Sequence, residues 1–290
     1  MNKTLSFMAV VIALGTGFFV AEARGPQGET VRETAFNRVM KTRELRCAYI
    51  SRPNHFETDS ATGQRKGMDY EIIEEAAKLL NLKVFWVEET GYGAYAEQLN
   101  SGKEDALCTT VWANSALAPR VLFTVPTIYS QLYTYVRQGD TRFDNNIEEL
   151  NNEKYTVSVI DGSALKAVAD KGFPKAKQIA APQLSDDSLL MQDVIQNKAD
   201  AGFFLGDIVA RFNRNNPQKT LKRVTGVAPV KVFPEVFAVA IGEFELREVL
   251  AVALTELHNN GTIERIVQKY ETSPGENGRV RSSYMTQEKL

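Results

Sequence analysis

Apolar and polar residues follow two periods along this chain, and together they predict a mixed α/β fold. Alternating or continuous apolar runs, typical of strands, occupy residues 45–50, 83–88, 106–111, 129–137, 155–160, 201–205 and 236–241. Apolar positions spaced three and four residues apart, typical of amphipathic helices, occupy residues 69–80, 92–100, 163–171, 188–197, 244–259 and 263–270. The strand and helix patterns largely alternate, which favours sheets covered by helices.

Two short segments share one construction. Residues 99–106 (LNSGKEDA) end a helical pattern and run into an apolar strand, and residues 194–201 (VIQNKADA) do the same further along the chain. Each contains a Gly or Asn suited to the left-handed conformation that stops a helix, followed by Lys-x-Asp-Ala. A unit that recurs once predicts two lobes of similar build, and the cleft between two lobes is a common place for a small ligand.

The pattern also predicts where the chain passes between the lobes. Crossings are expected near Tyr133–Val136 and Val236–Ala240, where β-branched or apolar runs end a series of helices and strands. Two parallel connections would permit hinge rotation about one axis. The expected parts are a loose leader at 24–37, lobe 1 at 38–134 plus 236–272, lobe 2 at 135–235 and a flexible polar tail at 273–290.

The first 23 residues predict export. A short positive start precedes an apolar stretch at 7–20, and Ala21-Glu22-Ala23 offers small residues to a signal peptidase. The apolar stretch is shorter than the roughly 20 residues that span a bilayer, although an uncleaved membrane anchor is the alternative. The first cysteine is Cys47, so the cleavage site offers no thiol for a lipid. We therefore expect a periplasmic protein without a lipid anchor.

Composition narrows the chemistry. A net charge of −2 and 43% apolar residues describe an ordinary globular protein, and the lack of a basic stripe argues against nucleic acid as a partner. Cys47 and Cys108 either form a disulfide in an oxidising compartment or stay buried as thiols. The two histidines, His55 and His258, have no close Cys/His spacing, so neither a metal nor another cofactor is expected.

An ordered series of short motifs resembles family 3 of the bacterial extracellular solute-binding proteins over about residues 43–271. The motifs are Leu45-Arg46-Cys47 with Pro53 and Phe56, then 67–72, 99–105, Phe123-Thr124-x-Pro126, 159–163, 198–201 and 260–264. The resemblance implies a two-lobed α/β fold of the type II periplasmic-binding-protein kind, with two crossing hinge strands. It further implies a non-enzymatic monomer that closes on a small polar solute and delivers it to an ABC-importer membrane permease. Finally, it implies that the first and third strands adjoin, which would place Cys47 and Cys108 on neighbouring strands.

The resemblance also assigns site residues. Tyr92 aligns with the aromatic that covers the ligand, and Thr109 and Thr110 align with the hydroxyl-bearing segment after the third strand. Gly162 and Ser163 lie at a helix start, where backbone N–H groups can hold an anionic group.

Three positions depart from the family pattern. Leu117 aligns with the arginine that normally grips an α-carboxylate, Leu205 with the aspartate that normally meets the ammonium, and Trp112 with a small hydroxyl residue. A buried zwitterion needs charge-assisted partners at both ends. We therefore expect a ligand other than an ordinary α-amino acid, or one held by other groups such as Arg52 and Glu235.

Alternatives remain at the level of the sequence. Arg120 and Asp207 lie close enough to the departing positions to restore the usual site under a shifted alignment. An accessory protein that binds a partner and has lost solute binding is a second possibility. A third is an enzyme similar to periplasmic cyclohexadienyl dehydratases, against which Leu117 argues. For such an enzyme His55 would be a candidate base, its ordinary interpretation being a solvated loop residue.

Overall fold

A computed structural model divides the chain into two units, Met1–Glu33 and Thr34–Leu290. The helices and strands belong to the second unit, Thr34–Leu290. The structure describes residues 33–182, 185–271 and 277–280. The predicted signal peptide at 1–23 and most of the predicted leader lie outside these residues. None of the described helices is long and apolar enough to cross a membrane.

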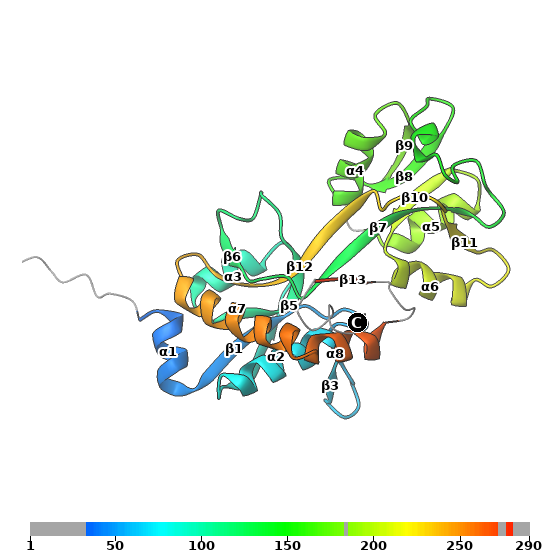
Figure 1. Cartoon of the computed structure of the whole chain (residues 1–290). Coiled ribbons are helices and arrows are strands. Elements are labelled where there is room, and N and C mark those ends of the chain that lie inside the picture. The colour runs from blue at the N-terminus through cyan, green and yellow to red at the C-terminus, as the bar shows by residue number, and fades with distance from the viewer. Residues whose placement is uncertain (1–32, 183–184, 272–276, 281–290) are drawn as a thin grey trace, which may run out of the picture. The chain divides into compact units, whose positions relative to one another are not determined.

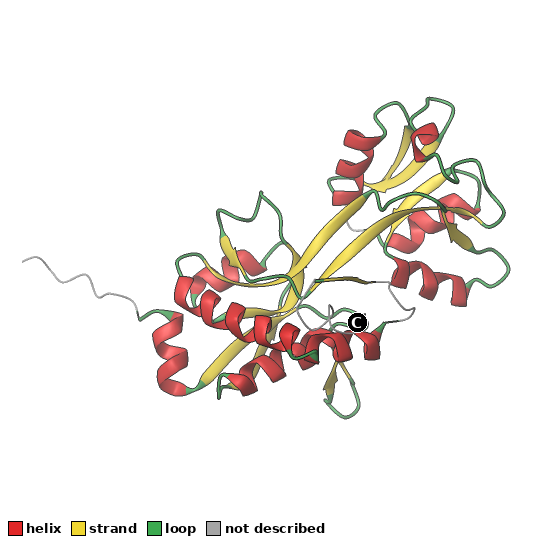
Figure 2. Ribbon diagram, viewed as in Figure 1, coloured by secondary structure: helices red, strands yellow, loops and turns green. Residues whose placement is uncertain are grey.

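One mixed sheet, whose strands are yellow in Figure 2, runs through this unit. Its strand order is β4-β1-β5-β12-β7-β10-β8-β9. In addition, β6 pairs with β12, whereas β11 and β13 pair with β7. The strands of this sheet are β1 (Glu44–Tyr49), β4 (Lys83–Glu89), β5 (Ala106–Trp112), β6 (Val121–Phe123), β7 (Ile128–Arg137), β8 (Thr156–Ile160), β9 (Lys177–Ala181), β10 (Ala201–Phe204), β11 (Leu221–Arg223), β12 (Lys231–Ala240) and β13 (Asn277–Arg279). A separate hairpin pairs β2 (Glu57–Thr58) with β3 (Arg65–Lys66).

Helices cover both halves of the sheet. Five helices pack with the first half: α1 (Ala35–Thr42), α2 (Met68–Leu79), α3 (Tyr95–Ser101), α7 (Phe244–Asn259) and α8 (Thr262–Tyr270). In the second half lie the short 3-10 helix η1 (Ile147–Leu150), α4 (Ala164–Gly172), α5 (Asp187–Ile195) and α6 (Gly206–Asn215). Helix α2 contacts both α7 and α8 although it is far from them in sequence (Figure 1).

The apolar side chains form separate cores in the two halves, as expected for a two-lobed α/β protein. One lobe has a core on each face of its sheet, built around residues such as Ile72 and Leu254 on one face and Tyr95 and Leu99 on the other. The other lobe has its own core, which contains Phe203 and neighbouring residues of β8, β10 and α5. The predicted fold class is confirmed.

Two long strands belong to both lobes. In β7, Ile128 packs in the first-lobe core that contains Ile72, and Leu132 packs in the core of the second lobe. β12 runs in the opposite direction, so Phe233 packs in the second-lobe core and Phe237 in the same first-lobe core as Ile128. β12 begins five residues before the expected run, and it contains Pro234, which reads as a strand breaker in the sequence because it lacks an N–H.

The aspartates of the two Lys-x-Asp-Ala segments make the same backbone hydrogen bonds in both lobes. Asp105 accepts a hydrogen bond from the Arg46 backbone N–H at 2.7 Å and returns its own N–H to the Arg46 carbonyl at 2.8 Å. Asp200 makes the same exchange with Thr156, at 2.9 and 2.7 Å. In each lobe the aspartate therefore satisfies the backbone of the neighbouring strand just before its own strand begins.

Cys47 and Cys108 lie on neighbouring parallel strands and form a disulfide, with their Cα atoms 5.4 Å apart. Both side chains are fully buried. The expected placement is confirmed, and the alternative of two buried thiols does not apply.

Both ends of the described chain differ from the sequence expectation. Helix α1 begins at Ala35, inside the expected loose leader, because Thr34 caps it and the Glu243 carboxylate accepts the Ala35 N–H at 2.8 Å. Within the expected flexible tail, β13 pairs with β7 and Arg279 forms ion pairs with Glu264 and Glu271. A side chain at position 278 would lie 3.1 Å from the Cβ of Tyr129, so glycine permits this close approach.

Candidate functional site

Residues from both lobes line a cleft of about 650 Å³. The first lobe contributes mainly polar and aromatic side chains, among them Arg52, His55, Tyr92, Tyr95, Trp112, Asn114 and Leu117. The second lobe contributes the starts of α4, α5 and α6, among them Ser163, Asp187, Leu205, Asp207 and Arg211. A cleft of this size suits a small molecule.

The loop after β1 carries the central residues of the site, and Gly67 fixes its position against α2. The φ of Gly67 is +130°, and a Cβ there would lie 2.2 Å from the carbonyl oxygen of His55. This close approach lets the backbone N–H of Asp69 donate to that carbonyl at 2.9 Å. The first turn of α2 therefore lies directly against the loop, and the Asp69 carboxylate is brought beside Arg52.

Arg52 forms a buried ion pair with Glu235 at the floor of the cleft. Nη1 and Nη2 of Arg52 lie 3.4 and 3.0 Å from the two carboxylate oxygens of Glu235. The Arg52 side chain is 22% exposed, whereas that of Glu235 is fully buried. Burial alone would raise the pKa of Glu235, but Arg52, His55 and hydrogen bonds outweigh it and hold this pKa far below its ordinary value. The pKa of Arg52 is raised in turn, because the charges of Glu235 and Asp69 outweigh its own desolvation.

Two further donors hold the Glu235 carboxylate. The indole Nε1–H of Trp112 donates to it at 2.9 Å, and the hydroxyl of Ser130 donates to the same oxygen. In the sheet, Glu235 on β12 lies between Trp112 on β5 and Ile128 on β7. The carboxylate is thus fixed at the position where the two long strands meet the first lobe.

Asp69 is a second carboxylate close to Arg52. Its carboxylate, 1% exposed, accepts the backbone N–H of Thr110 at 2.8 Å and the Thr110 hydroxyl at 2.9 Å. The Thr110 hydroxyl also accepts from Arg52 at 3.0 Å. Arg52, Glu235, Asp69 and Thr110 therefore form one connected network.

His55 belongs to the same network. Its Nδ1 lies 2.7 Å from an Arg52 nitrogen and 3.2 Å from Asp69. The residue is 8% exposed, which differs from the solvated loop histidine of the sequence interpretation because the turn at residues 52–56 folds back against α2.

The second lobe presents two carboxylates to the cleft. Asp187 and Asp207 lie in the first turns of α5 and α6 and both line it. Burial raises the pKa of Asp187, and the charges of Asp186 and Asp207 raise it further against the opposing charge of Arg211. This face is therefore locally rich in negative charge.

The structure brings six of the ten predicted site residues to the cleft surface: Arg52, Tyr92, Trp112, Leu117, Ser163 and Leu205. Glu235 and Thr110 lie behind Arg52 and hold it. Thr109 and Gly162 are outside the lining, since the Thr109 hydroxyl accepts the Ile50 N–H and Gly162 forms the turn before α4.

Arg120, the arginine that a shifted alignment would assign to the ligand, lies outside the cleft. Arg120 forms an exposed ion pair with Glu97 at 3.0 Å and is not among the residues that line the cleft. Asp207 does line it. The shifted alignment is therefore supported for the aspartate alone.

Sequence reasoning did not assign His55, Asp69, Ser130 or Asp187 to the site. Asp69 opens one predicted helix and Asp187 directly precedes another, and an acidic residue at such a position looks the same in sequence whether it faces solvent or a cleft. Ser130 carried no local signal. The pairing of Glu235 with Arg52 joins residues 183 positions apart.

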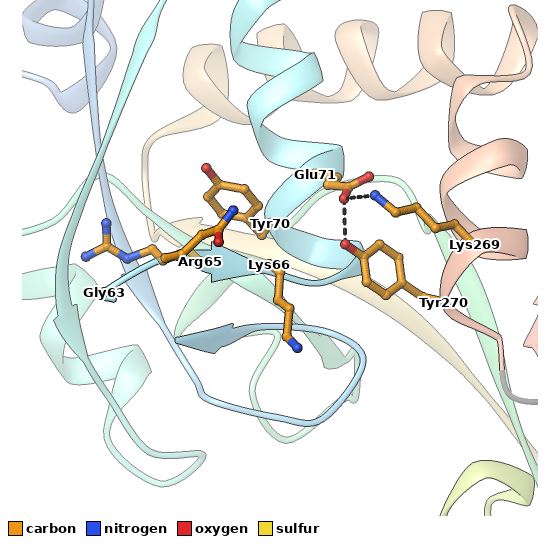
Figure 3. A pocket seen from close by; sticks show the side chains of 8 residues that line it. Gly63, Arg65, Lys66, Tyr70, Glu71, Lys269 and Tyr270 are labelled. Atoms are coloured by element: carbon orange, nitrogen blue, oxygen red, sulfur yellow. Dashed lines mark hydrogen bonds and ion pairs between the residues drawn. The ribbon is translucent and has the colours of Figure 1, made fainter. Parts of the chain in front are cut away.

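A second hollow lies on the first lobe alone. It has a volume of about 710 Å³ and is bordered by β3, the start of α2 and the end of α8 (Figure 3). Glu71 accepts hydrogen bonds there from Tyr270 and Lys269, both at 2.5 Å. Arg65 and Lys66 come from the neighbouring hairpin. The buried charges described above and residues of both lobes meet in the cleft, so we take the cleft as the candidate site.

Within the described part of the chain, no group of three or more His, Cys, Asp or Glu side chains is arranged to hold a metal ion. The polar groups of the cleft are instead two arginine side chains, carboxylates, hydroxyls and amides. Such an arrangement suits the recognition of an organic solute by hydrogen bonds and charge.

Two α/β lobes joined by two long strands, with a ligand-sized cleft between them, define the class of two-lobed solute-binding proteins. The chain belongs to the bacterial extracellular solute-binding proteins, family 3, whose model matches residues 45–273. This membership agrees with the resemblance found in the sequence.

Curated relatives carry binding-protein names. The chain is 23% identical to a protein named "Probable histidine-binding protein" of Campylobacter jejuni, over 91% of this chain and 98% of that protein. It is 24% identical to the "Histidine-binding periplasmic protein" of Escherichia coli K12, over 74% and 82% of the two chains.

Solved structures show the same fold. A binding component of an ABC transporter from Wolinella succinogenes, complexed with lysine, aligns with a TM-score of 0.64 and 20% identity over 80% of this chain and 97% of that one. An ancestral amino-acid-binding protein, described as a precursor of cyclohexadienyl dehydratase, aligns with a TM-score of 0.63 and 22% identity over 82% and 99%.

Proposed function

We propose that this protein captures a small polar solute in the periplasm for an ABC importer, and that the solute is not an ordinary α-amino acid. The family and the names of the relatives support the transport role. One observation carries the ligand class: Arg52, the cationic side chain that the first lobe offers to the cleft among the described residues, is already paired with Glu235.

Two of the three departures found in the sequence support the same ligand class. Leu117 and Leu205 both line the cleft, so the positions aligned with the usual arginine and aspartate present apolar surface there. Neither leucine can offer a charged partner to a carboxylate, and a carboxylate that is buried without one costs several kcal/mol. An α-amino acid would therefore be bound poorly in the usual pose.

The remaining polar groups favour a neutral or cationic solute. Asp187 and Asp207 face the cleft from the second lobe, and Asn114 and Ser163 add groups that form hydrogen bonds. Burial and then repulsion from Asp186 and Asp207 raise the pKa of Asp187, and an ammonium group beside Asp187 and Asp207 would offset that repulsion. Tyr92, which is 57% exposed, is available to cover the solute.

Lobe closure about β7 and β12 is the proposed mechanism. The two strands connect the cores, so a rotation there would bring the aspartates of the second lobe onto a solute held by the first lobe. The closed form would gain its affinity from contacts made with both lobes at once. A monomer in this state would then dock on the permease.

Matched pairs of ligands test the proposal. L-Lysine, L-histidine and L-arginine differ from cadaverine, histamine and agmatine by the α-carboxylate alone. Each compound is added, together with neutral sugars, to the chain that begins at residue 24, and thermal unfolding is followed. We expect at least one solute without the carboxylate to raise the unfolding temperature, because binding to the folded state alone stabilises it.

The other outcomes separate the alternatives. Calorimetric binding of an ordinary L-amino acid with a dissociation constant of about 1 μM or below would contradict the proposed ligand class. No response to any solute would favour the accessory partner-binding protein. Turnover of a carboxylate substrate would favour the dehydratase-like enzyme, against which the occupied Arg52 argues.

A further inference from the structure

We propose that Glu235 is a specificity-determining residue that acts as an internal carboxylate: it occupies the anion-binding face of Arg52 and so excludes carboxylate ligands from the cleft. This inference rests on the proposed function, which it deepens by naming the residue that rejects carboxylates. A guanidinium binds a carboxylate through two parallel N–H bonds, and two Arg52 nitrogens lie 3.4 and 3.0 Å from the Glu235 oxygens.

The surroundings of Glu235 are those of an anion-binding site. Three donors from three different elements converge on the carboxylate: Arg52 from the loop after β1, Trp112 from β5 and Ser130 from β7. The carboxylate is fully buried and strongly favoured in its ionised form, as the lowered pKa of Glu235 shows. Such a set of donors would bind a ligand carboxylate if the chain did not supply its own.

One nitrogen of Arg52, Nη2, is already surrounded by acceptors within the protein. This nitrogen, 3.0 Å from Glu235, also lies 3.0 Å from the Thr110 hydroxyl and 2.7 Å from Nδ1 of His55, and Asp69 lies 3.8 Å away. Two carboxyl groups, those of Glu235 and Asp69, therefore face the one guanidinium of Arg52. A ligand carboxylate would meet net negative charge at this end of the cleft, although Arg52 itself remains 22% exposed to it.

The test removes the internal carboxylate and supplies a free one. Glu235→Ala and Glu235→Gln are titrated with sodium acetate, with sodium chloride at equal ionic strength as the reference, and binding is measured from thermal unfolding and calorimetry. We expect both variants to bind acetate at least about tenfold more tightly than the wild type, because acetate then occupies the Arg52 donors.

Two matched variants identify the cause. Asp207→Asn removes one negative charge from the cleft but leaves Arg52 paired, so it should not gain acetate binding. The double variant Arg52→Gln/Glu235→Gln should lose the gain. Equal acetate binding by Asp207→Asn, or retention of the gain in the double variant, would overturn the proposal.

A measurement on the wild type covers the case in which the Glu235 variants do not fold. The guanidinium N–H signals of Arg52 are followed by NMR during an acetate titration. We expect them to stay unchanged, and a saturable shift would overturn the proposal. Acetate is the only ligand required, so a wild type that binds none of the natural solute candidates would count against the proposed function and leave this test intact.

Discussion

Buried charge in this protein is arranged in sets that the sequence presents as isolated residues. His55 and Asp69 appear as a loop histidine and a helix-start acid, and Glu235 as a carboxylate before a strand. In the structure the three contact Arg52 within one network. Residue type and local pattern predicted a ligand cleft and named Arg52 and Glu235 as groups that could hold the ligand, but the partners come from segments whose contact depends on the tertiary fold.

Asp187 is the residue whose charge the folded protein disfavours. Its pKa is raised above the ordinary value of 3.8 by burial and by Asp186 and Asp207. The unfavourable contribution is absent below pH 3.8 and develops as pH rises through the folded-state pKa, so at neutral pH it is fully present. Asp187→Asn should therefore raise the free energy of unfolding at pH 7 by about 0.5 kcal/mol.

Chemical denaturation across the pH range checks this prediction. The difference between Asp187→Asn and the wild type should vanish below pH 3.8. Asp186→Asn is the matched control, because Asp186 caps α5 through Ser188 and its pKa is lowered. An equal stabilisation by the control would show that the effect is not specific to Asp187.

Elements with strong apolar periodicity were predicted well, and elements set by tertiary contacts were not. The ranges of β5, α2 and α7 agree with the sequence to within about one residue. Helix α6 was missed because its N-cap is Leu205, which provides no side-chain hydrogen bond, and its first residue is a glycine. The predicted start of β12 was too late, because Pro234 lies inside the strand.

The disulfide joins two parallel strands of the first lobe and should stabilise that lobe. Its cysteines are separated by 61 residues, and closing a loop of that length in the unfolded chain is worth about 4 kcal/mol. The double variant Cys47→Ala/Cys108→Ala should lose about this free energy of unfolding in denaturant titrations.

Reducing agent provides the comparison. Both cysteines are fully buried, so the native wild type should resist reduction until it unfolds, and the double variant should show no response to reductant. A double variant as stable as the oxidised wild type would contradict the prediction.

The whole molecule was predictable in architecture but less so in specificity. The order of motifs indicated a two-lobed protein, and the repeated Asp105 and Asp200 segments prove to be equivalent in their backbone contacts. The ligand could not be read from the same evidence. Departures at Leu117 and Leu205 indicated what the cleft lacks, whereas what it offers depends on how Arg52 is occupied.

Strand β13 has a consequence for self-association. It pairs with β7 at Ile128–Ser130, on the side opposite to β12, and so covers backbone groups that would otherwise form an open sheet edge. Open edges recruit strands from other molecules. A chain that ends at Glu271 should therefore form concentration-dependent dimers or larger species, detectable by light scattering after size exclusion.

Arg279→Ala is the matched control, because it removes the ion pairs to Glu264 and Glu271 but keeps the strand. We expect it to remain mainly monomeric. If the shortened chain is as monomeric as the full chain, β13 does not protect this edge. If it associates, the last described strand is the part of the protein that keeps the sheet from being extended by a neighbour.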